Sequence, residues 1–457
     1  MRSLETLTLL FLLLTISVFF IDKKRFKFLL LLMATIGSLI AQYFIEGLRW
    51  QFAPCVYLLI VMYIIHRLNK NSVKLIYRAL VSIWYVIAAA LPIIIPVFSL
   101  PTPQGNHAVG TEVFHWVDSS KSEWFTPEKL EDYRETMVQF WYPGVLKSKQ
   151  EPEPYMDYID LRAVAIAEAG KLPSFLPSHL NLVETNSYKN LQYQSANENI
   201  PVVVFSHGLT GSRFLHQSLF EHLASYGYAV VAIDHSYDCN LTVFPNRRTA
   251  NYRSDITGHP DSIRIRKQQM ITRTNDVLFV LDQLEKIQSS KIRSNLNGRL
   301  NLQKIALGGH SYGGATAILS AQRDKRIQLC FALDGWINPL PDSIIENGLN
   351  VPVMYMGRPS WGDSDYPSNY SKLDNLMRST RSVKYYLIIK ETLHLDYTDV
   401  PLYSPIIKYV VDVGNLPSSI SVSTVNRLVK GFLDSHLMNK PDEEFRSILS
   451  NPLIVNL

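Results

Sequence analysis

The chain has 457 residues, of which 47% are hydrophobic and 19% are charged, and its formal net charge is +5. This length predicts two or three domains, and the high apolar content excludes an intrinsically disordered chain or a coiled coil. The three cysteines are too few for a disulfide scaffold.

The positive charge is concentrated at the N-terminal end. The first 105 residues hold ten lysines and arginines against three acids, a net of +7. The remaining residues hold 35 of the 45 basic and 37 of the 40 acidic side chains, a net of −2. We therefore interpret the basic excess as a topology signal and expect no nucleic-acid partner.

Four apolar runs without an ionised side chain lie in the same N-terminal stretch. They are Thr6–Ile21, Phe28–Ile45, Phe52–Ile65 and Ala79–Leu100. A bilayer-spanning helix needs about 20 apolar residues, which the second and fourth runs supply and the other two reach with their flanks. The pattern predicts about four transmembrane helices within residues 1–100 and disfavours a soluble helix bundle. Because no charge lies inside the runs, we expect a membrane anchor rather than a transport path.

The loops between these runs predict how the chain crosses the membrane. Asp22–Lys27 and His66–Arg78 carry four basic residues each, whereas Glu46–Gln51 carries only Arg49. Basic loops stay on the cytoplasmic side, so four spans place everything after Leu100 outside the cytoplasm. We expect a multi-pass protein of the cell membrane whose soluble part is extracytoplasmic.

After residue 105 the pattern changes to alternating strands and helices. Strands are predicted at Thr136–Tyr142, Pro201–Phe205, Tyr228–Ile233, Leu302–Leu307, Ile327–Leu333, Val351–Met356 and Val383–Ile389. Helices are predicted at Leu215–Tyr226, Met270–Ile287, Gly313–Gln322 and Asn426–Leu437. Nearly continuous apolar strands that alternate with helices predict an α/β fold, with a mostly parallel sheet covered on both faces.

The predicted domains are a membrane segment at 1–100, a catalytic α/β domain at 101–440 and a C-terminal tail at 441–457. Two long connections, Gly144–Asn199 and Cys239–Lys267, are expected near the mouth of the site, because the carboxyl ends of the strands line the crevice in open α/β sheets. A disulfide between Cys239 and Cys330 is allowed by the pattern but nothing requires it.

The segment Leu307–Gly314, LGGHSYGG, carries the strongest chemical signal. It contains G-x-S-x-G, with Gly309 two residues before Ser311 and Gly313 two residues after it, between a predicted strand and a predicted helix. In this context the serine lies in a strained strand-to-helix turn, where it is exposed as a nucleophile. An ordinary glycine-containing turn is the alternative.

A serine nucleophile needs a base and an acid that orients the base, here in the chain order Ser, Asp, His. Asp334 ends the strand that follows Ser311, and His394 lies in a loop just after a later strand. These two residues are the predicted orienting acid and base. Asp396 and Asp399 lie too close to His394 in sequence to be preferred as the acid, although a salt-bridge role stays open.

Two backbone N–H groups must stabilise the oxyanion that forms during acyl transfer. The amide of Tyr312, directly after the nucleophile, is one candidate. The amide of Leu209, in the loop Ser206–Gly211 after a strand, is the other. An ordinary strand-to-helix turn is again the alternative for this loop.

These motifs together resemble the plasma-type (isoform II) platelet-activating factor acetylhydrolase family of α/β-hydrolases, single-chain calcium-independent phospholipases A2. The resemblance runs from about Pro101 to Leu437 and rests on Val109–Thr111, Arg134–Pro143, Ser206–Arg213, Leu307–Gly314, Ala332–Trp336 and His394–Asp399. It implies an α/β-hydrolase fold, with Ser311 as nucleophile, Asp334 as orienting acid, His394 as base, and Leu209 and Tyr312 as oxyanion donors. The N-terminal membrane segment and the Gly144–Asn199 connection depart from the family pattern.

We therefore expect a membrane-anchored serine ester hydrolase that acts through an acyl-enzyme and needs no metal or cofactor. Its expected substrate is an acyl ester in or near the bilayer, such as the sn-2 acyl group of a phospholipid. A carboxylesterase, polyester hydrolase or peptidase of another α/β-hydrolase group is the alternative. A catalytically silent membrane protein for sensing or transport is an alternative from a different class.

Overall fold

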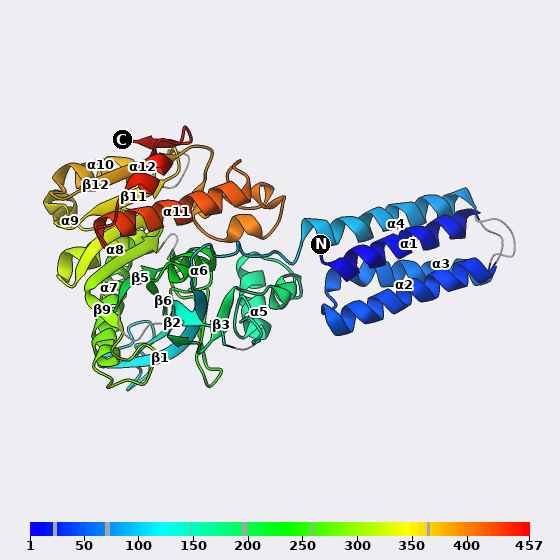
Figure 1. Ribbon diagram of the computed structural model, residues 1–457, viewed down its shortest axis with the longest axis horizontal. Helices are drawn as coiled ribbons and strands as arrows, with labels where there is room; N and C mark the ends of the chain where they lie inside the picture. The colour runs from blue at the N-terminus through cyan, green and yellow to red at the C-terminus, as the bar shows by residue number, and fades with distance from the viewer. Residues whose placement is uncertain (22–24, 69–73, 148, 194–198, 257–258, 363–365) are drawn as a thin grey trace. The chain divides into compact units, whose positions relative to one another are not determined.

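The computed structural model describes residues 1–21, 25–68, 74–147, 149–193, 199–256, 259–362 and 366–457 (Figure 1). The chain divides into two compact units. The first, which we call the helical unit, contains Met1–Ser99, Met156–Glu184 and Tyr403–Ile406. The second, which we call the sheet unit, contains Leu100–Tyr155, Thr185–Leu402 and Ile407–Leu457.

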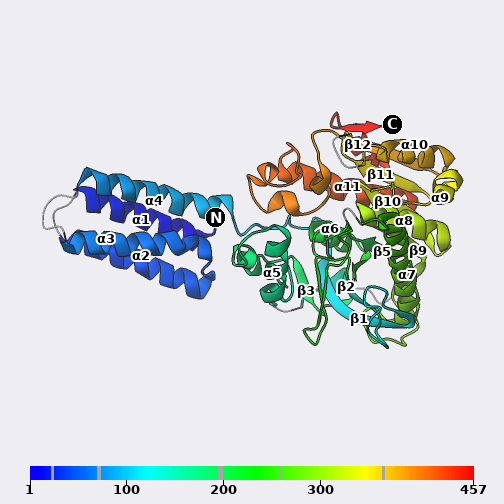
Figure 2. The same ribbon diagram turned by 180° about the vertical axis from the view of Figure 1, so that it is seen from behind.

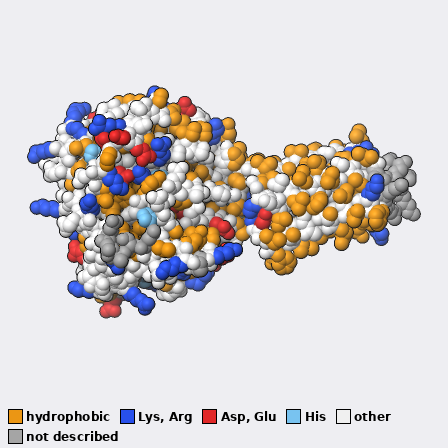
Figure 3. All heavy atoms as spheres, viewed as in Figure 1, with side chains coloured by type: hydrophobic (Ala, Val, Ile, Leu, Met, Phe, Trp, Pro, Cys, Tyr) orange, Lys and Arg blue, Asp and Glu red, His pale blue; other side chains and the backbone are white. Residues whose placement is uncertain are grey.

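Four long helices dominate the helical unit. They are α1 (Ser3–Ile21), α2 (Arg25–Ile45), α3 (Ala53–Leu68), which follows the short η1 (Trp50–Phe52), and α4 (Leu75–Ile94). Within the described residues α1, α2, α4 and the segment Trp50–Leu68, which joins η1 to α3, are long and apolar enough to cross a membrane. Large apolar side chains cover their outer surfaces, and Figure 3 shows them as a nearly continuous apolar coat.

One end of the four-helix bundle carries a buried ion pair and contacts the segment Met156–Glu184. The buried Arg49 side chain donates to the buried Glu5 carboxylate at 2.7 Å. The indole Nε1 of Trp50 donates to the carbonyl of Leu176 at 3.1 Å, and the Trp50 ring lies 5.2 Å from the ring of Phe175. The middle of the Gly144–Asn199 connection, with α5 (Ile159–Ala169) and η2 (Leu176–Leu182), therefore packs within the helical unit.

The sheet unit is built around one large mixed sheet. Its main path has the order β13-β12-β11-β10-β9-β5-β6-β2-β1-β3, and β4 pairs with β2. The strands are β1 (Ala108–Ser122), β2 (Tyr133–Val145), β3 (Ser187–Lys189), β4 (Gln192–Tyr193), β5 (Ile200–Ser206), β6 (Ala229–His235), β9 (Leu300–His310), β10 (Ile327–Leu333), β11 (Val353–Gly357), β12 (Lys384–Ile389) and β13 (Ile454–Asn456). The six strands from β6 to β12 along this path are parallel, so their carboxyl ends meet at one edge. A separate hairpin pairs β7 (Leu241–Val243) with β8 (Thr249–Asn251).

Helices cover both faces of this sheet, and each face has its own apolar core (Figure 1, Figure 2). One face carries α6 (Gln217–Ser225) and α11 (Ser418–His436). The other carries α7 (Ser262–Gln288), α8 (Tyr312–Arg323), α9 (Asp342–Asn347) and α10 (Asn369–Ser379). This arrangement confirms the predicted α/β fold, in which β-branched, doubly buried strands form the central parallel sheet.

The seven predicted strands and four predicted helices of this unit are all observed, as β2, β5, β6, β9, β10, β11 and β12 and as α6, α7, α8 and α11. Residues 441–457, expected as a tail, instead form α12 (Glu443–Leu449) and the edge strand β13. They are ordered because Phe445 and Ile448 are buried against the sheet core. Cys239 and Cys330 are both buried and are not joined by a disulfide, so the bridge that the sequence allows does not form.

Candidate active site

Ser311 lies at the tip of a tight turn between β9 and α8. Its backbone has φ +55° and ψ −121°, a conformation that costs a non-glycine residue energy and is typical of functional turns. A side chain at Gly313 would place its Cβ 2.0 Å from the carbonyl oxygen of Ser206, and one at Gly309 would meet the carbonyl of Gly313 at 2.2 Å. The two glycines are therefore required by close backbone contacts, as a nucleophile turn demands.

Asp334 and His394 are hydrogen-bonded to each other. Asp334 directly follows β10, and His394 begins the short helix η3 (His394–Tyr397) after β12. The Nδ1 atom of His394 lies 2.6 Å from Oδ2 of Asp334, whose side chain is fully buried. The other oxygen, Oδ1, accepts from the backbone N–H of Arg358 at 3.1 Å and from the indole of Trp361 at 3.2 Å. Both carboxylate oxygens are thus held, which fixes the acid and orients the imidazole.

Backbone contacts bring Ser311 next to this pair. Its N–H donates to the carbonyl of Leu333 at 3.0 Å, and its carbonyl accepts from Trp336 at 2.9 Å, on either side of Asp334. The ring nitrogen Nε2 of His310 lies 3.0 Å from the carbonyl of His394. Within the described residues no hydrogen bond joins the Ser311 hydroxyl to His394.

The loop after β5 passes close to Ser311. A Cβ at Gly208 would lie 3.1 Å from the Cβ of Ser311. The backbone N–H groups of Leu209 and Tyr312 have no acceptor among the residues that the structure describes. Both amides that the sequence predicts as oxyanion donors are therefore unpaired among the described residues, and Gly208, the residue before Leu209, lies beside Ser311.

An arginine that the sequence patterns did not single out holds this loop. The buried Arg273 of α7 donates from Nη1 to the carbonyl of His207 at 2.6 Å and from Nη2 to the carbonyl of Gly208 at 3.3 Å. Its Nε pairs with the buried Asp238 at 2.8 Å. Because Arg273 binds the loop carbonyls, it fixes the peptide planes on which the free amides depend. The one sequence signal was an arginine on the buried face of a predicted helix.

Arg358 is a second residue that the sequence patterns missed. Its Nε lies 3.3 Å from Oδ2 of Asp334, and its Nη1 donates at 3.0 Å to Asp412, which also accepts from the backbone N–H of His394 at 3.3 Å. The guanidinium lies 4.2 Å from the centre of the Trp361 ring. Arg358 therefore links the loop that carries His394 to the acid that orients it.

The neighbouring histidines are unsuited to act as the base. Burial, together with the adjacent His394, lowers the pKa of His310 well below its usual value. Burial and the charge of Arg273 do the same for the pKa of His207. Both rings are therefore very weak bases that accept a proton poorly, and both are already hydrogen-bonded to backbone groups.

Asp396 and Asp399 do not contact the His394 ring within the described residues. Asp396 accepts from the amides of Leu393 and Gly414 and so shapes the loop. Asp399 accepts from the amide and hydroxyl of Ser218 and from the hydroxyl of Tyr155. Burial raises the pKa of Asp399 to about 7. The neighbouring Glu221 accepts from Asn186 and Ser187, and burial raises its pKa to about 7 as well.

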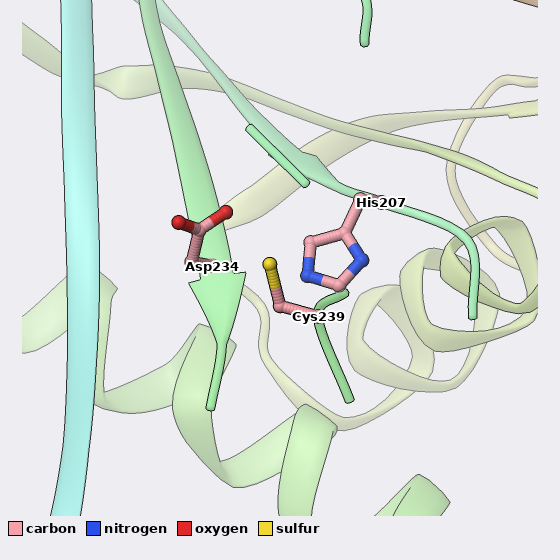
Figure 4. Close-up of side chains that lie close together, drawn as sticks. All are labelled: His207, Asp234 and Cys239. Carbon is pink, nitrogen blue, oxygen red and sulfur yellow. The ribbon is translucent and has the colours of Figure 1, made fainter. Parts of the chain in front are cut away.

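Three potential metal ligands, His207, Asp234 and Cys239, converge beside the site (Figure 4). Each already has a partner. Nε2 of His207 accepts from the amide of His235 at 3.1 Å, Cys239 donates to the carbonyl of Leu241, and Asp234 is paired with the buried guanidinium of Arg213. A cation would have to displace that guanidinium, so these residues do not fit a metal centre.

This chain is similar in sequence and in structure to several known proteins. The model of the family "Platelet-activating factor acetylhydrolase, isoform II" matches residues 97–449. The platelet-activating factor acetylhydrolase of Canis lupus familiaris is 24% identical over 55% of this chain and 61% of its own length. The enzyme of that name from Gallus gallus is 24% identical over 76% of this chain and 85% of its own length. A putative phospholipase A2 of Schizosaccharomyces pombe is 27% identical over 51% of this chain and 60% of its own length.

Among solved structures, a ferulic acid esterase from Streptomyces cinnamoneus has a TM-score of 0.64 and 26% identity, and the match covers 79% of this chain and all of that one. The chain spans about three fifths of the length of the first curated relatives that it matches. Since the family model covers most of the chain, the protein belongs to the platelet-activating factor acetylhydrolase, isoform II, family.

Proposed function

We propose that this protein is a membrane-anchored serine hydrolase that cleaves carboxylic esters of phospholipid type through an acyl-enzyme. The observation that carries the proposal is the hydrogen-bonded Asp334–His394 pair beside the strained Ser311 turn. The substrate class is supported by the family to which the chain belongs. It is also supported by relatives whose names are platelet-activating factor acetylhydrolase, probable 1-alkyl-2-acetylglycerophosphocholine esterase and putative phospholipase A2.

In the proposed mechanism the Ser311 hydroxyl attacks the ester carbonyl while Nε2 of His394 takes its proton. Asp334 stabilises the imidazolium through Nδ1, and the amides of Leu209 and Tyr312 stabilise the oxyanion. His394 then protonates the departing alcohol, leaving an acyl group on Ser311. A water molecule, deprotonated by His394, hydrolyses this acyl-enzyme in the second half of the reaction.

Membrane anchoring is supported by the four apolar helices of the helical unit. We predict that the basic loops lie in the cytoplasm, and this prediction supports an extracytoplasmic sheet unit. An anchored esterase meets substrates that partition into the bilayer, which fits a phospholipid ester better than a freely soluble one.

A serine-directed fluorophosphonate probe tests the mechanism. Full-length protein in detergent should be labelled, and Ser311→Ala should abolish labelling and reduce ester hydrolysis by about 10⁴-fold or more. Ser423→Ala, which changes an exposed serine of α11, serves as the matched control and should label normally. Persistent labelling of Ser311→Ala would refute the assignment of the nucleophile.

The substrate class is tested separately with short-acyl phospholipids and soluble esters. Hydrolysis of the sn-2 acyl group of phospholipids is the expected result. Turnover confined to soluble aromatic esters would instead favour the alternative esterase activity that the ferulic acid esterase neighbour suggests.

A further inference from the structure

A cavity of about 520 Å³ opens beside the candidate active site at the carboxyl edge of the parallel strands. It is bounded by the start of α7, by the loop after β10 and by a residue of the loop after β11. Ligands of open α/β sheets bind at this edge.

Contacts through the nucleophile turn connect this cavity to Ser311. The amide of Trp336, a lining residue, donates to the carbonyl of Ser311 at 2.9 Å. The hydroxyl of Tyr312, the residue after the nucleophile, donates to the carbonyl of Arg266, another lining residue, at 2.8 Å. Two residues that line the cavity, Arg266 and Trp336, therefore also contact the nucleophile turn, which brings the cavity within reach of a substrate bound at Ser311.

The charge of the cavity is positive. Its lining includes three cations, Arg266, Lys267 and Lys372, and one carboxylate, Asp342. Asp342 lies 3.6 Å from Lys372, which leaves Arg266 and Lys267 without an acidic partner among the described residues. The exposed Lys267 ammonium has no hydrogen-bond partner in the part of the chain that the structure describes. Like charges that converge on a concave surface attract and concentrate anions.

The aromatic lining is not arranged to hold a quaternary ammonium group. Recognition of choline requires free ring faces that surround the cation. Here the guanidinium of Arg266 lies 5.7 Å from the centre of the Trp336 ring, and the ring of Tyr366 packs at 4.2 Å from the same ring. A choline headgroup would meet a cation where it needs an open aromatic face.

We propose that this cavity binds an anionic group of the ester substrate, namely the phosphate of a glycerophospholipid whose headgroup carries no compensating cation. The proposal rests on the proposed function and specifies its substrate class. Arg266 and Lys267 neutralise the phosphate, so phosphatidate and phosphatidylglycerol are better substrates than phosphatidylcholine of the same acyl composition.

The test uses the full chain in neutral detergent micelles and sn-2 acetyl substrates that differ only in headgroup. The expected result is a kcat/KM at least about tenfold higher for phosphatidate and phosphatidylglycerol than for phosphatidylcholine, a preference that shrinks at high salt. Lys267→Gln should raise KM for the anionic substrates about fivefold with little change in kcat, because an exposed cation contributes a modest attraction. Lys325→Gln, an exposed lysine before the amino end of β10, is the matched control.

Each alternative outcome has a distinct meaning. Equal or better hydrolysis of phosphatidylcholine, or a KM that Lys267→Gln leaves unchanged, would overturn the anionic site while the proposed esterase stands. Failure to hydrolyse any phospholipid, with Ser311 still labelled by the fluorophosphonate probe, would refute the proposed substrate class itself. Inorganic phosphate serves as a competitor: inhibition that Lys267→Gln relieves supports a site for phosphate from any source. Lack of inhibition together with the anionic preference assigns the site to lipid-borne phosphate.

Discussion

The two units of this protein differ in how far their apolar side chains are exposed. In the helical unit large side chains such as Met33, Ile83 and Val86 are exposed by 59–64% along the outer faces of the helices. In the sheet unit every residue of the strands β5 and β6 is buried. This difference is the one we expect if, as we propose, hydrocarbon surrounds the helices while water surrounds the sheet.

Both units also contain buried ion pairs, which lie in different parts of their structures. In the helical unit the buried pair Glu5–Arg49 lies where α1 begins and where the chain turns toward α3, away from the apolar middle of the helices. In the sheet unit the buried pair Arg273–Asp238 holds the loop after β5, and the buried pair Arg134–Asp276 joins β2 to α7. Such buried pairs add little net stability, because burial removes water from both charges.

A charge introduced at an exposed apolar position should have the most different effects in the two units. Ile83→Lys, near the middle of α4, should cost about 3 kcal/mol in membrane insertion. Val117→Lys, at a comparably exposed site on β1 of the sheet unit, should have almost no effect. The measurement is the fraction of full-length chain that resists alkaline extraction from membranes. Equal retention of the two variants would contradict a bilayer environment for α4.

Glycine-to-alanine changes test whether the backbone is packed more closely at Gly313 of the sheet unit than at Gly37 of the helical unit. Gly313→Ala should destabilise the sheet unit by about 1–3 kcal/mol, because its Cβ would lie 2.0 Å from the carbonyl oxygen of Ser206. Gly37→Ala, in α2, has no atom within 4 Å of the new Cβ and should be neutral or slightly stabilising. Thermal unfolding of each variant, followed by circular dichroism in detergent, measures the difference. A Gly313→Ala protein with unchanged unfolding and labelling would show that the turn tolerates a side chain.

The last expected effect is a pH dependence of the sheet unit. Burial raises the pKa of Glu221 in the folded protein to about 7, above its ordinary value of 4.5. The folded state then binds more protons than the unfolded state between these values, so stability is full below about pH 4.5 and falls as pH rises through 7. Glu221→Gln should therefore flatten the decline in Tm between pH 5 and pH 8 by a few degrees, whatever its absolute stability. The same decline in both proteins would contradict the role of Glu221.

Much of the fold and the centre of the site could be predicted from short stretches of sequence. The Ser311 turn is recognisable because close backbone contacts demand glycines at fixed offsets, and the parallel strands because they are apolar over their whole length. The chain order of Asp334 and His394 suggested their roles, but their 2.6 Å hydrogen bond required the folded protein. The assignment of Ser311, Asp334, His394, Leu209 and Tyr312 to catalysis stays a prediction until the variants are measured.

The sequence by itself determined the apolar helices, the positions of the central strands along the chain and the glycine-flanked turn at Ser311, because each depends on residues close together in the chain. Only the tertiary structure decided which side chains support the site. Arg273 binds a carbonyl 66 residues away, and Arg358 binds Asp412 at a separation of 54 residues. The positive cavity beside Trp336 likewise combines cations from α7 and α10. No local pattern encodes such partners, because long-range packing alone brings them together.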